Sequence, residues 1–325
     1  MGATGAVGTE FLRILEQRNF RLRSLKLLAS SRSAGRKLKF AGEDLVVEEL
    51  TEKSFRGIDL VLASAGGGVS KKFAPIAVKD GAVVVDNTSA FRMEPDVPLV
   101  VPEVNSQDIR THKGIIANPN CSTIIMNVPV WPLHKANPIR RIVVSTYQAV
   151  SGAGAWGLWE LDEQIRAYAA GQPIKKNKFP HQIVNNLFSH NSEIGDDGYN
   201  LEERKMLLET RKIFHAPKIL ITATCVRVPV MRAHSESINL QFTDPITEDR
   251  VREILATAPG VRIVDDRAGN HFPMPLEASD QDDVLVGRIR QDLSQPDGRG
   301  IEMFVSGDQL RKGAALNAVQ IAEML

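Results

Sequence analysis

The stretch Gly2-Ala3-Thr4-Gly5-Ala6-Val7-Gly8 decides how the first part of the chain folds. Its three glycines recur at every third residue, and a helical pattern with Phe11, Leu12 and Leu15 on one face follows. Glycines before a helix let the backbone approach a pyrophosphate group at the helix N-terminus, where backbone N–H groups lack partners. The spacing is GxxGxxG and not the commoner GxGxxG, and any glycine-rich motif alone is a weak signal. The stretch therefore predicts either a dinucleotide-binding turn or a chance turn.

A dinucleotide motif normally follows a β-strand, and only Met1 precedes this one. We therefore expect the first strand of a Rossmann-like domain to be missing from the sequence. The next segment, Leu25–Ala29, reads as a short buried strand that ends in Ser30, Arg32 and Ser33. An acidic residue after the second strand selects NAD, whereas arginine and hydroxyl groups accommodate the 2′-phosphate of NADP. These residues favour NADP, although a plain basic turn fits them equally well.

Strands and helices continue to alternate through the first third of the chain. Asp59–Ala63 reads as a strand, Ser64–Ser70 as a loop that opens a helix around Phe73–Val78, and Ala82–Asp86 as another strand. This alternation predicts a parallel, doubly wound sheet. Ligands gather at the carboxyl ends of such strands, so Arg92 is placed to bind an anion. The alternative for Arg92 is a surface salt bridge.

A second stretch, Asn118-Pro119-Asn120-Cys121-Ser122-Thr123, carries the chemistry. Asn-Pro is a turn signal and Ser, Thr and Asn open helices, so the stretch predicts a loop that delivers Cys121 to the first turn of a helix. The positive end of a helix favours a thiolate, the nucleophilic form of cysteine. The alternative is a small buried hydrophobe, which describes most free cysteines. Pro129 predicts that this helix is short or kinked, because proline removes an intrahelical hydrogen bond.

From Arg140 onward the pattern predicts an α+β domain with an open sheet. The expected strands are Arg141–Val150, Lys218–Val230 paired with Ser235–Phe242, Gly287–Asp292 and Ile301–Ser306; the expected helices are Leu158–Tyr168, Leu201–Phe214, Thr247–Leu255 and Leu310–Met324. The last helix is expected to return to the nucleotide-binding domain. We therefore expect a nucleotide-binding domain formed by residues 1–120 with 307–325, and a catalytic and dimerisation domain formed by residues 121–306.

Composition limits the class of protein. The 325 residues carry a net charge of +1, which gives no electrostatic reason to expect nucleic acid or an acidic membrane as a partner. Two cysteines, Cys121 and Cys225, do not form a disulfide framework and indicate a reducing compartment. Cys225 lies in an apolar run and is expected to be inert core. We expect no metal, no membrane span and no targeting segment.

With these motifs in place, the sequence resembles the aspartate-β-semialdehyde dehydrogenases over nearly its whole length. The motifs that carry the resemblance are Gly2–Gly8, Ser30–Gly35, Asp86–Met93, Asn118–Thr123, Thr146–Gly154, Glu202–Lys205, Arg227–His234 and Lys312–Glu323. The sequences of Val284–Asp292 and Gly307–Gln309 resemble those of the plant and algal type. A plant or algal protein would work in the plastid stroma, and a bacterial one in the cytoplasm.

The resemblance implies roles for single residues. Cys121 matches the acyl-forming nucleophile and His234 the acid/base group, which needs a pKa near working pH. Gln148 matches the residue that orients the substrate, and Arg227 the one that binds its carboxylate. Glu202 matches the contact to the substrate amino group, although Glu202 and Lys205 could also be a surface helix pair.

The resemblance also implies the phosphate site, the cofactor site and the assembly. The phosphate contacts would be Arg92, Asn120 and Lys205, and the NADP contacts Thr4, Gly5, Ala6, Val7, Arg32, Ser33, Ser151, Gly152 and Asn317. Family members are usually homodimers, or dimers of dimers, built through the second domain. The missing strand is expected to lower stability and weaken cofactor binding.

The reaction implied is L-aspartyl-4-phosphate + NADPH ⇌ L-aspartate-4-semialdehyde + phosphate + NADP⁺, a step in lysine, methionine, threonine and isoleucine biosynthesis. One alternative is a related N-acylglutamyl-phosphate reductase, which the carboxylate contacts would distinguish. Another is an inactive NADP-binding homologue. A thiol hydrolase would use Cys121 and His234 without a cofactor, and it would leave the glycine-rich stretch and Arg32 unexplained.

Overall fold

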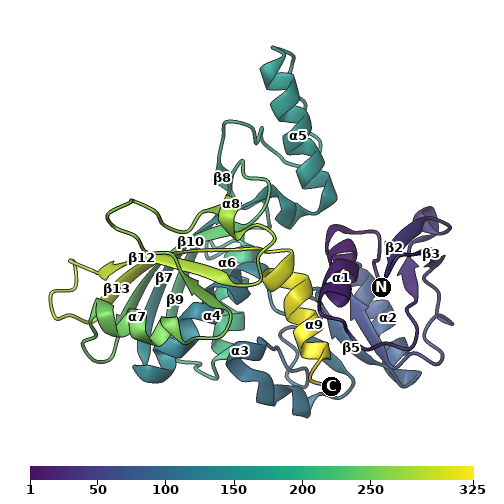
Figure 1. Cartoon of the computed structure of the whole chain (residues 1–325), viewed down its shortest axis with the longest axis horizontal. Helices are drawn as coiled ribbons and strands as arrows, with labels where there is room; N and C mark the ends of the chain where they lie inside the picture. The colour runs from purple at the N-terminus through teal and green to yellow at the C-terminus, as the bar shows by residue number, and fades with distance from the viewer. The chain divides into compact units, whose positions relative to one another are not determined.

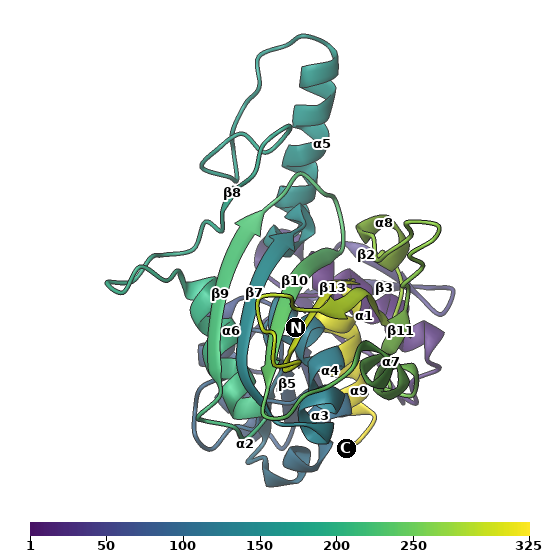
Figure 2. The same cartoon turned by 90° about the vertical axis from the view of Figure 1, so that its left-hand side faces the viewer.

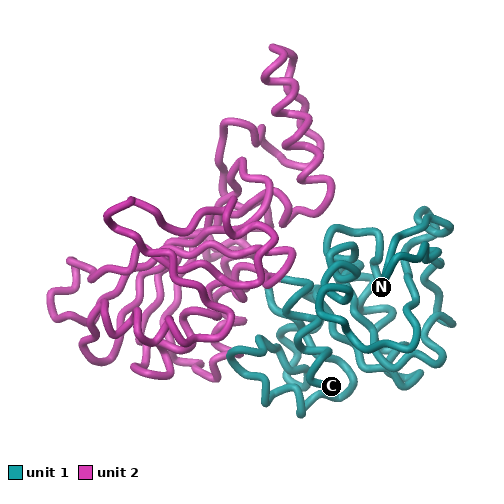
Figure 3. The backbone as a smooth tube through the Cα atoms, in the orientation of Figure 1, with its two compact units in different colours: residues 1–120, 314–325 teal, residues 121–313 magenta.

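The computed structural model describes all 325 residues, which divide into two compact units. The first unit consists of Met1–Asn120 together with Ala314–Leu325, and the second of Cys121–Gly313 (Figure 3). Both termini of the chain therefore belong to the same unit.

The first unit is built on two three-stranded sheets with the orders β1-β3-β2 and β4-β5-β6. Their strands are β1 (Leu27–Ala29), β2 (Lys37–Phe40), β3 (Glu43–Glu49), β4 (Leu60–Ala63), β5 (Val83–Asp86) and β6 (Ile115–Ala117). β4, β5 and β6 pair in parallel, as do β1 and β3, which confirms the predicted parallel sheet. The antiparallel hairpin of β2 and β3 was not predicted, because its charged and largely exposed residues lack an apolar pattern.

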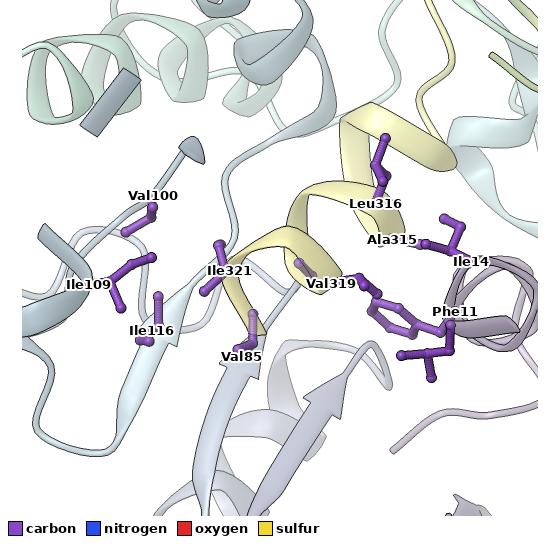
Figure 4. Packing of buried hydrophobic residues seen from close by; sticks show 12 residues of the cluster. Phe11, Ile14, Val85, Val100, Ile109, Ile116, Ala315, Leu316, Val319 and Ile321 are labelled. Atoms are coloured by element: carbon purple, nitrogen blue, oxygen red, sulfur yellow. The ribbon is translucent and has the colours of Figure 1, made fainter. Parts of the chain in front are cut away.

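Helices cover these sheets, and the last helix completes their core. They are α1 (Ala6–Gln17), α2 (Gly67–Lys79), α3 (Pro102–Asn105) and α9 (Leu316–Ala322), with short 3₁₀ turns at Ser31–Ser33 and Ser106–Thr111. Val319 and Ile321 of α9 pack in one cluster with Phe11 of α1, Val85 of β5 and Ile116 of β6 (Figure 4). The predicted final helix Leu310–Met324 is in fact a π-helical turn, Arg311–Ala315, followed by α9.

The start of the chain links the two sheets of the first unit. The Gly2 N–H donates to Leu28 O of β1 at 2.7 Å, and the Met1 ammonium donates to Leu62 O of β4 at 2.8 Å. Beyond these bonds lies a cavity of about 880 Å³ whose apolar lining includes Leu15, Leu28 and Leu62. Residues of both β1 and β4 thus line one slot.

Two glycines of the opening motif are required by close packing. A Cβ atom on Gly8 would lie 2.2 Å from Gly2 O, and one on Gly2 would lie 2.6 Å from Ser64 O. Gly2 also has a φ of 85°, which favours glycine. The motif therefore brings the N-terminus of α1 close to the backbone that precedes it.

The second unit is built on a seven-stranded mixed sheet with the order β11-β12-β13-β10-β7-β9-β8. Its strands are β7 (Ile139–Gln148), β8 (Phe188–Ser189), β9 (Leu220–Arg227), β10 (His234–Phe242), β11 (Val261–Ile263), β12 (Val284–Gln291) and β13 (Gly300–Gly307). The prediction that β9 and β10 pair with each other is wrong, because β7 lies between them. The connection from β9 to β10 passes the end of β7, where the Val150 N–H donates to Val230 O.

Helices α4 (Cys121–Ala136), α6 (Leu201–Ile213) and α7 (Glu248–Ala256) pack on this sheet (Figure 2). Pro129 does not shorten the helix after Cys121, since α4 continues through Pro129 and Pro132 to Ala136, and the alternative of a kink stays a prediction. Ten of its residues are buried, so tertiary packing compensates for the lost intrahelical hydrogen bonds. The remaining helices are α5 (Ala155–Ala169) and α8 (Pro275–Ala278), with a 3₁₀ turn at Val150–Ala153. α5 projects from the sheet of its own unit (Figure 1).

None of these helices combines the length and the apolar composition needed to cross a bilayer. The structure also contains no group of three His, Cys, Asp or Glu side chains that could hold a metal ion.

Candidate active site

The candidate site of the second unit starts at the N-terminus of α4. Cys121 is the first residue of this helix, as the Asn-Pro-Asn turn before it predicted, and its side chain is half-buried. A Cβ atom on Gly313 would lie 3.0 Å from Cys121 Cβ, so a larger residue at position 313 would push against the cysteine by a few tenths of an ångström. The positive end of the α4 dipole lies at the sulfur, which favours the thiolate.

His234 faces this sulfur and is held in one orientation by the backbone. Its Nε2 lies 3.5 Å from Cys121 Sγ, while its Nδ1 accepts a hydrogen bond from the Ala149 N–H at 3.0 Å. Because Nδ1 is an acceptor, the neutral ring carries its proton on Nε2. The pair is therefore arranged as an N–H donor pointing at a sulfur acceptor, and the imidazole stabilises a thiolate by hydrogen bonding.

The electrostatics of His234 differ from the expected acid/base group. Complete burial, and to a lesser extent the nearby charge of Arg227, hold the pKa of His234 well below its usual value. A lowered pKa keeps the ring neutral near pH 7, so its Nε2–H is a hydrogen-bond donor. His234 is the first residue of β10.

Arg227 and Gln148 lie side by side on the parallel strands β9 and β7, where they are register partners. Both are buried, and Arg227 Nη1 donates to Ala149 O at 2.7 Å. One residue, Ala149, thus anchors both Arg227 and His234 through its backbone. Arg227 Nε is buried and has no hydrogen-bond partner within the chain, so it is an open donor inside the site.

Glu202 and Lys205 are placed by the first turn of α6. Asn200 caps this helix in a capping box with Glu203, which fixes the start of the helix. Glu202 accepts from Gln148 Nε2 at 3.1 Å and from Lys205 Nζ at 2.9 Å, and its side chain is only 6% exposed. The interpretation of these residues as an ordinary surface pair is therefore wrong, because Glu202 belongs to a buried network with Gln148.

Ser151 and Gly152, which the resemblance assigns to cofactor binding, also lie in the second unit. A Cβ atom on Gly152 would lie 3.1 Å from His234 Nε2 and 3.2 Å from Arg227 Nη1. Glycine therefore keeps open the space beside both side chains. Ser151 is buried and its hydroxyl accepts a hydrogen bond from Gln309 Nε2.

In the first unit, the residues assigned to NADP gather at the N-terminus of α1. Gly5 is the N-cap residue of α1 and provides no side-chain cap, so Ala6 and Val7 offer backbone N–H groups to a ligand. Thr4 Oγ1 donates to Ser33 Oγ at 3.2 Å, which connects this turn with the 3₁₀ turn after β1. Arg32 lies exposed on that 3₁₀ turn. A glycine-packed helix start beside an exposed arginine and two hydroxyl groups fits a dinucleotide with a 2′-phosphate.

Three other predicted residues of the first unit are buried. The guanidinium of Arg92 donates to Asn118 O at 2.9 Å and to Asn87 O at 3.0 Å. Asn317 donates through its amide nitrogen to Val100 O and to Asn118 Oδ1. Asn120 is buried next to Cys121 in the sequence. Arg92 and Asn317 thus both fix the Asn118 loop that leads to the cysteine.

Several residues that shape the candidate site could not be identified from the sequence. Ala149 acts through its backbone, Gly313 through its lack of a side chain, and Thr146 through a hydroxyl that donates to Gln148 Oε1 at 3.3 Å. Only tertiary structure reveals such roles. Cys225 is fully buried beside Met206, and burial raises its pKa, in agreement with the expected inert core.

Two family models match the chain. Residues 1–112 match "Semialdehyde dehydrogenase, NAD binding domain", and residues 130–312 match "Semialdehyde dehydrogenase, dimerisation domain". Relatives named aspartate-semialdehyde dehydrogenase are 57% identical in Synechocystis sp. and 48% identical in Bacillus subtilis. Both alignments cover 100% of this chain and 96% of the relative.

Solved structures agree with these sequence matches. The aspartate semialdehyde dehydrogenase II of Vibrio cholerae, solved in complex with ASA, is 44% identical and superposes with a TM-score of 0.96, covering 100% of this chain and 96% of the other. The enzyme of Candida albicans, solved with NADP, is 26% identical with a TM-score of 0.77 over 100% of this chain and 96% of its own.

Proposed function

Because the chain belongs to the aspartate-semialdehyde dehydrogenase family, we propose that its candidate site converts L-aspartyl-4-phosphate and NADPH into L-aspartate-4-semialdehyde, phosphate and NADP⁺. The observation that carries this proposal is the pairing of Cys121 at the start of α4 with the buried His234, 3.5 Å away. Around this pair lie a buried arginine with an open donor and a buried carboxylate, as a zwitterionic substrate requires.

Cys121 is the nucleophile of the proposed reaction. Its thiolate attacks the acyl carbon of aspartyl phosphate, the C–O bond to phosphate breaks, and a thioester remains on the sulfur. The Nε2–H of His234, which no longer stabilises the thiolate, becomes a donor beside the tetrahedral carbon attached to Cys121. It can donate a hydrogen bond to the oxyanion on that carbon, which collapses to the aldehyde and the Cys121 thiolate when the C–S bond breaks. The positive end of the α4 dipole adds further stabilisation to a developing oxyanion.

The other side chains bind and orient the substrate. Arg227 would take the carboxylate, because a planar guanidinium with an open Nε matches a carboxylate in a bidentate manner. Glu202 would accept from the substrate ammonium, and Gln148 would orient the acyl group next to Cys121. Lys205 would contribute to phosphate binding, as would Arg92 and Asn120.

NADP would be held by the residues of the glycine-rich turn, the turn after β1, and the segment beside His234. These residues are Thr4, Gly5, Ala6, Val7, Arg32, Ser33, Ser151, Gly152 and Asn317. When bound, the cofactor supplies or accepts the hydride through its nicotinamide ring. The protein contributes an anion-binding helix start and, at Gly152, space next to the catalytic pair.

We further propose a homodimer, or a dimer of dimers, formed through the second unit, which matches the family's dimerisation domain. In this arrangement the first unit binds the nucleotide and the second carries the chemistry. The second unit begins at Cys121, the proposed nucleophile.

The test follows NADPH formation at 340 nm with aspartate semialdehyde, phosphate and NADP⁺. The parent chain and Cys225→Ser are expected to show phosphate-dependent turnover, whereas Cys121→Ser is expected to show none. Turnover without phosphate, or turnover by Cys121→Ser, would contradict the proposal. NADP⁺ binding without turnover by the parent would favour the inactive homologue, and a preference for N-acetylglutamate semialdehyde would favour the related reductase.

A further inference from the structure

His190 lies close to the candidate site without a role in the proposed mechanism. It follows β8, and its N–H donates to Cys225 O of β9 at 2.8 Å, which ties it to the strand that carries Arg227. Its side chain is half-buried, so part of the ring can be reached by a ligand. The ring interacts electrostatically with Glu202, Arg227 and Lys205.

The hydrogen bonds around Ser192 determine which ring nitrogen of His190 carries the proton. Ser192 Oγ accepts from the Glu202 N–H at 3.2 Å and donates to Asn200 Oδ1 at 3.3 Å. His190 Nδ1 lies 3.1 Å from the same oxygen. Because the single hydroxyl proton goes to Asn200, Nδ1–H of His190 is the donor in this contact. The neutral ring therefore presents an unprotonated Nε2.

The second nitrogen of this ring is available for a ligand. Nε2 of His190 makes no hydrogen bond within the chain. Burial lowers the pKa of His190 to about 4, so the ring is neutral at physiological pH. The charge of Glu202 raises this pKa, whereas the charges of Arg227 and Lys205 lower it. A neutral nitrogen with an exposed lone pair accepts hydrogen bonds from cations, whereas it repels the oxygens of carboxylates and phosphates.

A substrate ammonium group needs such an acceptor at this place. It carries three N–H donors, whereas both oxygens of Glu202 already accept from other side chains, Gln148 and Lys205. A neutral acceptor beside Glu202 adds a hydrogen bond without adding a charge to be buried. We propose that His190 is a specificity-determining residue whose Nε2 accepts a hydrogen bond from the α-ammonium of the substrate. This inference rests on the proposed function.

The kinetic test compares two aldehydes that differ only in the ammonium group. Aspartate semialdehyde and 4-oxobutanoate, which has hydrogen in its place, are measured as substrates or as competing inhibitors. His190→Ala is expected to lower kcat/KM for aspartate semialdehyde roughly tenfold, mainly through KM, because a hydrogen bond to a charged group is lost. The corresponding value for 4-oxobutanoate stays unchanged, and His190→Gln, which retains an acceptor, recovers part of the loss.

Two further measurements separate ammonium recognition from a structural role or an anion-binding role of His190. His181→Ala, an exposed histidine of the same connection, serves as the matched control and is expected to behave like the parent. If His190→Ala lowers kcat/KM equally for both aldehydes, His190 only holds Ser192 in place. If the substitution raises only the KM of phosphate, His190 is an anion ligand. Either result overturns the proposal. Nitrogen chemical shifts of the His190 ring, which do not depend on turnover, are expected to show the Nδ1–H form. An Nε2–H form would also overturn it, whereas absence of turnover by the parent would instead contradict the proposed function.

Discussion

The two cysteines of the chain occupy opposite environments, which makes their reactivity a direct test of the site. Cys121 is half-buried at the start of a helix, whereas Cys225 is fully buried and has a raised pKa caused by burial. We expect iodoacetamide to alkylate the native protein at Cys121 alone, with loss of activity in parallel. Mass spectrometry of the digested protein checks this, and Cys121→Ser should remain unlabelled. Label on Cys225 before unfolding would contradict the structure.

Gly152 tests the geometry around His234. An added Cβ would stand 3.1 Å from His234 Nε2 and 3.2 Å from Arg227 Nη1, so both side chains would have to shift by a few tenths of an ångström. Gly152→Ala is expected to lower kcat/KM by roughly tenfold or more while the thermal midpoint changes little. Gly68→Ala, where nothing lies within 4 Å of the added Cβ, is the control. Full activity of Gly152→Ala would show that the site tolerates a displaced His234.

We expect the buried carboxyl group of Glu236 to make the free energy of unfolding depend on pH. This residue of β10 is fully buried, neither of its carboxyl oxygens has a hydrogen-bond partner, and burial holds its pKa well above the usual value. Above the ordinary glutamate pKa the unfolded chain loses this proton while the folded chain keeps it. The free energy of unfolding therefore falls as pH rises, by about 1.4 kcal/mol per pH unit at most, until the folded-state pKa is reached.

Glu236→Gln removes this dependence, so its thermal midpoint relative to the parent is expected to rise between about pH 5 and pH 7. Thermal unfolding followed by circular dichroism at both pH values measures the difference. Glu163→Gln, an exposed change, should keep a constant difference. Parallel behaviour of Glu236→Gln and the parent would mean that the carboxyl group is ionised or solvated in the folded protein.

Residue types and their order in the chain were readable from the sequence, but the tautomers were not. The position of Cys121 followed from a turn signal that acts over neighbouring residues. The proton on His234 Nε2 instead follows from the N–H of Ala149, which is 85 residues away in the chain. Such a contact depends on the pairing order of distant strands, which a local pattern does not contain.

At the scale of elements, local sequence signals predicted several strands correctly, but they did not predict which strands pair. Short buried runs predicted β4 and β5 well, because parallel strands buried on both faces read as continuous apolar segments. The pairing of β9 with β10 was wrong, since proximity in the chain suggested a hairpin while β7 separates the two strands. Pro129 was also misleading, because the buried surface of α4 outweighs the penalty of one proline.

We expect the protein to become more stable when an additional β-strand fills the slot between β1 and β4. The side chains that line it, among them Leu28 and Leu62, are apolar and offer a surface on which further apolar side chains can be buried. An N-terminal extension of about five β-branched residues would add a parallel strand and replace the ammonium with a peptide bond. Burial of these side chains is expected to raise the thermal midpoint by roughly 5–10 °C and to tighten NADP⁺ binding.

Differential scanning fluorimetry with and without NADP⁺ measures both effects of the extension. A Gly-Ser extension of equal length is the matched control, because it has no apolar side chains to bury. Equal midpoints for the two extended proteins would show that the cavity of about 880 Å³ does not receive a strand.

At the scale of the whole molecule, α5 presents an apolar surface to solvent. Trp156 is 67% exposed and Tyr168 59% exposed, and Trp159 and Ile165 of the same helix are also exposed. Because this helix lies within the matched dimerisation domain, we expect a second copy to cover these side chains. Sedimentation should give twice the chain mass of 35.7 kDa for a dimer, or four times this mass for a dimer of dimers.

The double change Trp156→Ser and Trp159→Ser should shift the chain toward monomer, whereas Arg166→Ser on the same helix should not. Monomer at every concentration of the parent would contradict the dimer. A dimer unaffected by the double change would place the interface elsewhere on the second unit.

The participation of both chain ends in one unit has a consequence for synthesis on the ribosome. Residues 1–120 are translated first, yet the apolar faces of Phe11 and Val85 are covered by Val319 and Ile321, which emerge last. The segment Cys121–Gly313 can fold as soon as it has left the exit tunnel. The nucleotide-binding unit, although its residues 1–120 were made first, keeps part of its core exposed until the last residues emerge. That waiting period is when a chaperone is most needed, and a premature stop a few codons before the end would damage the half of the protein that was made first.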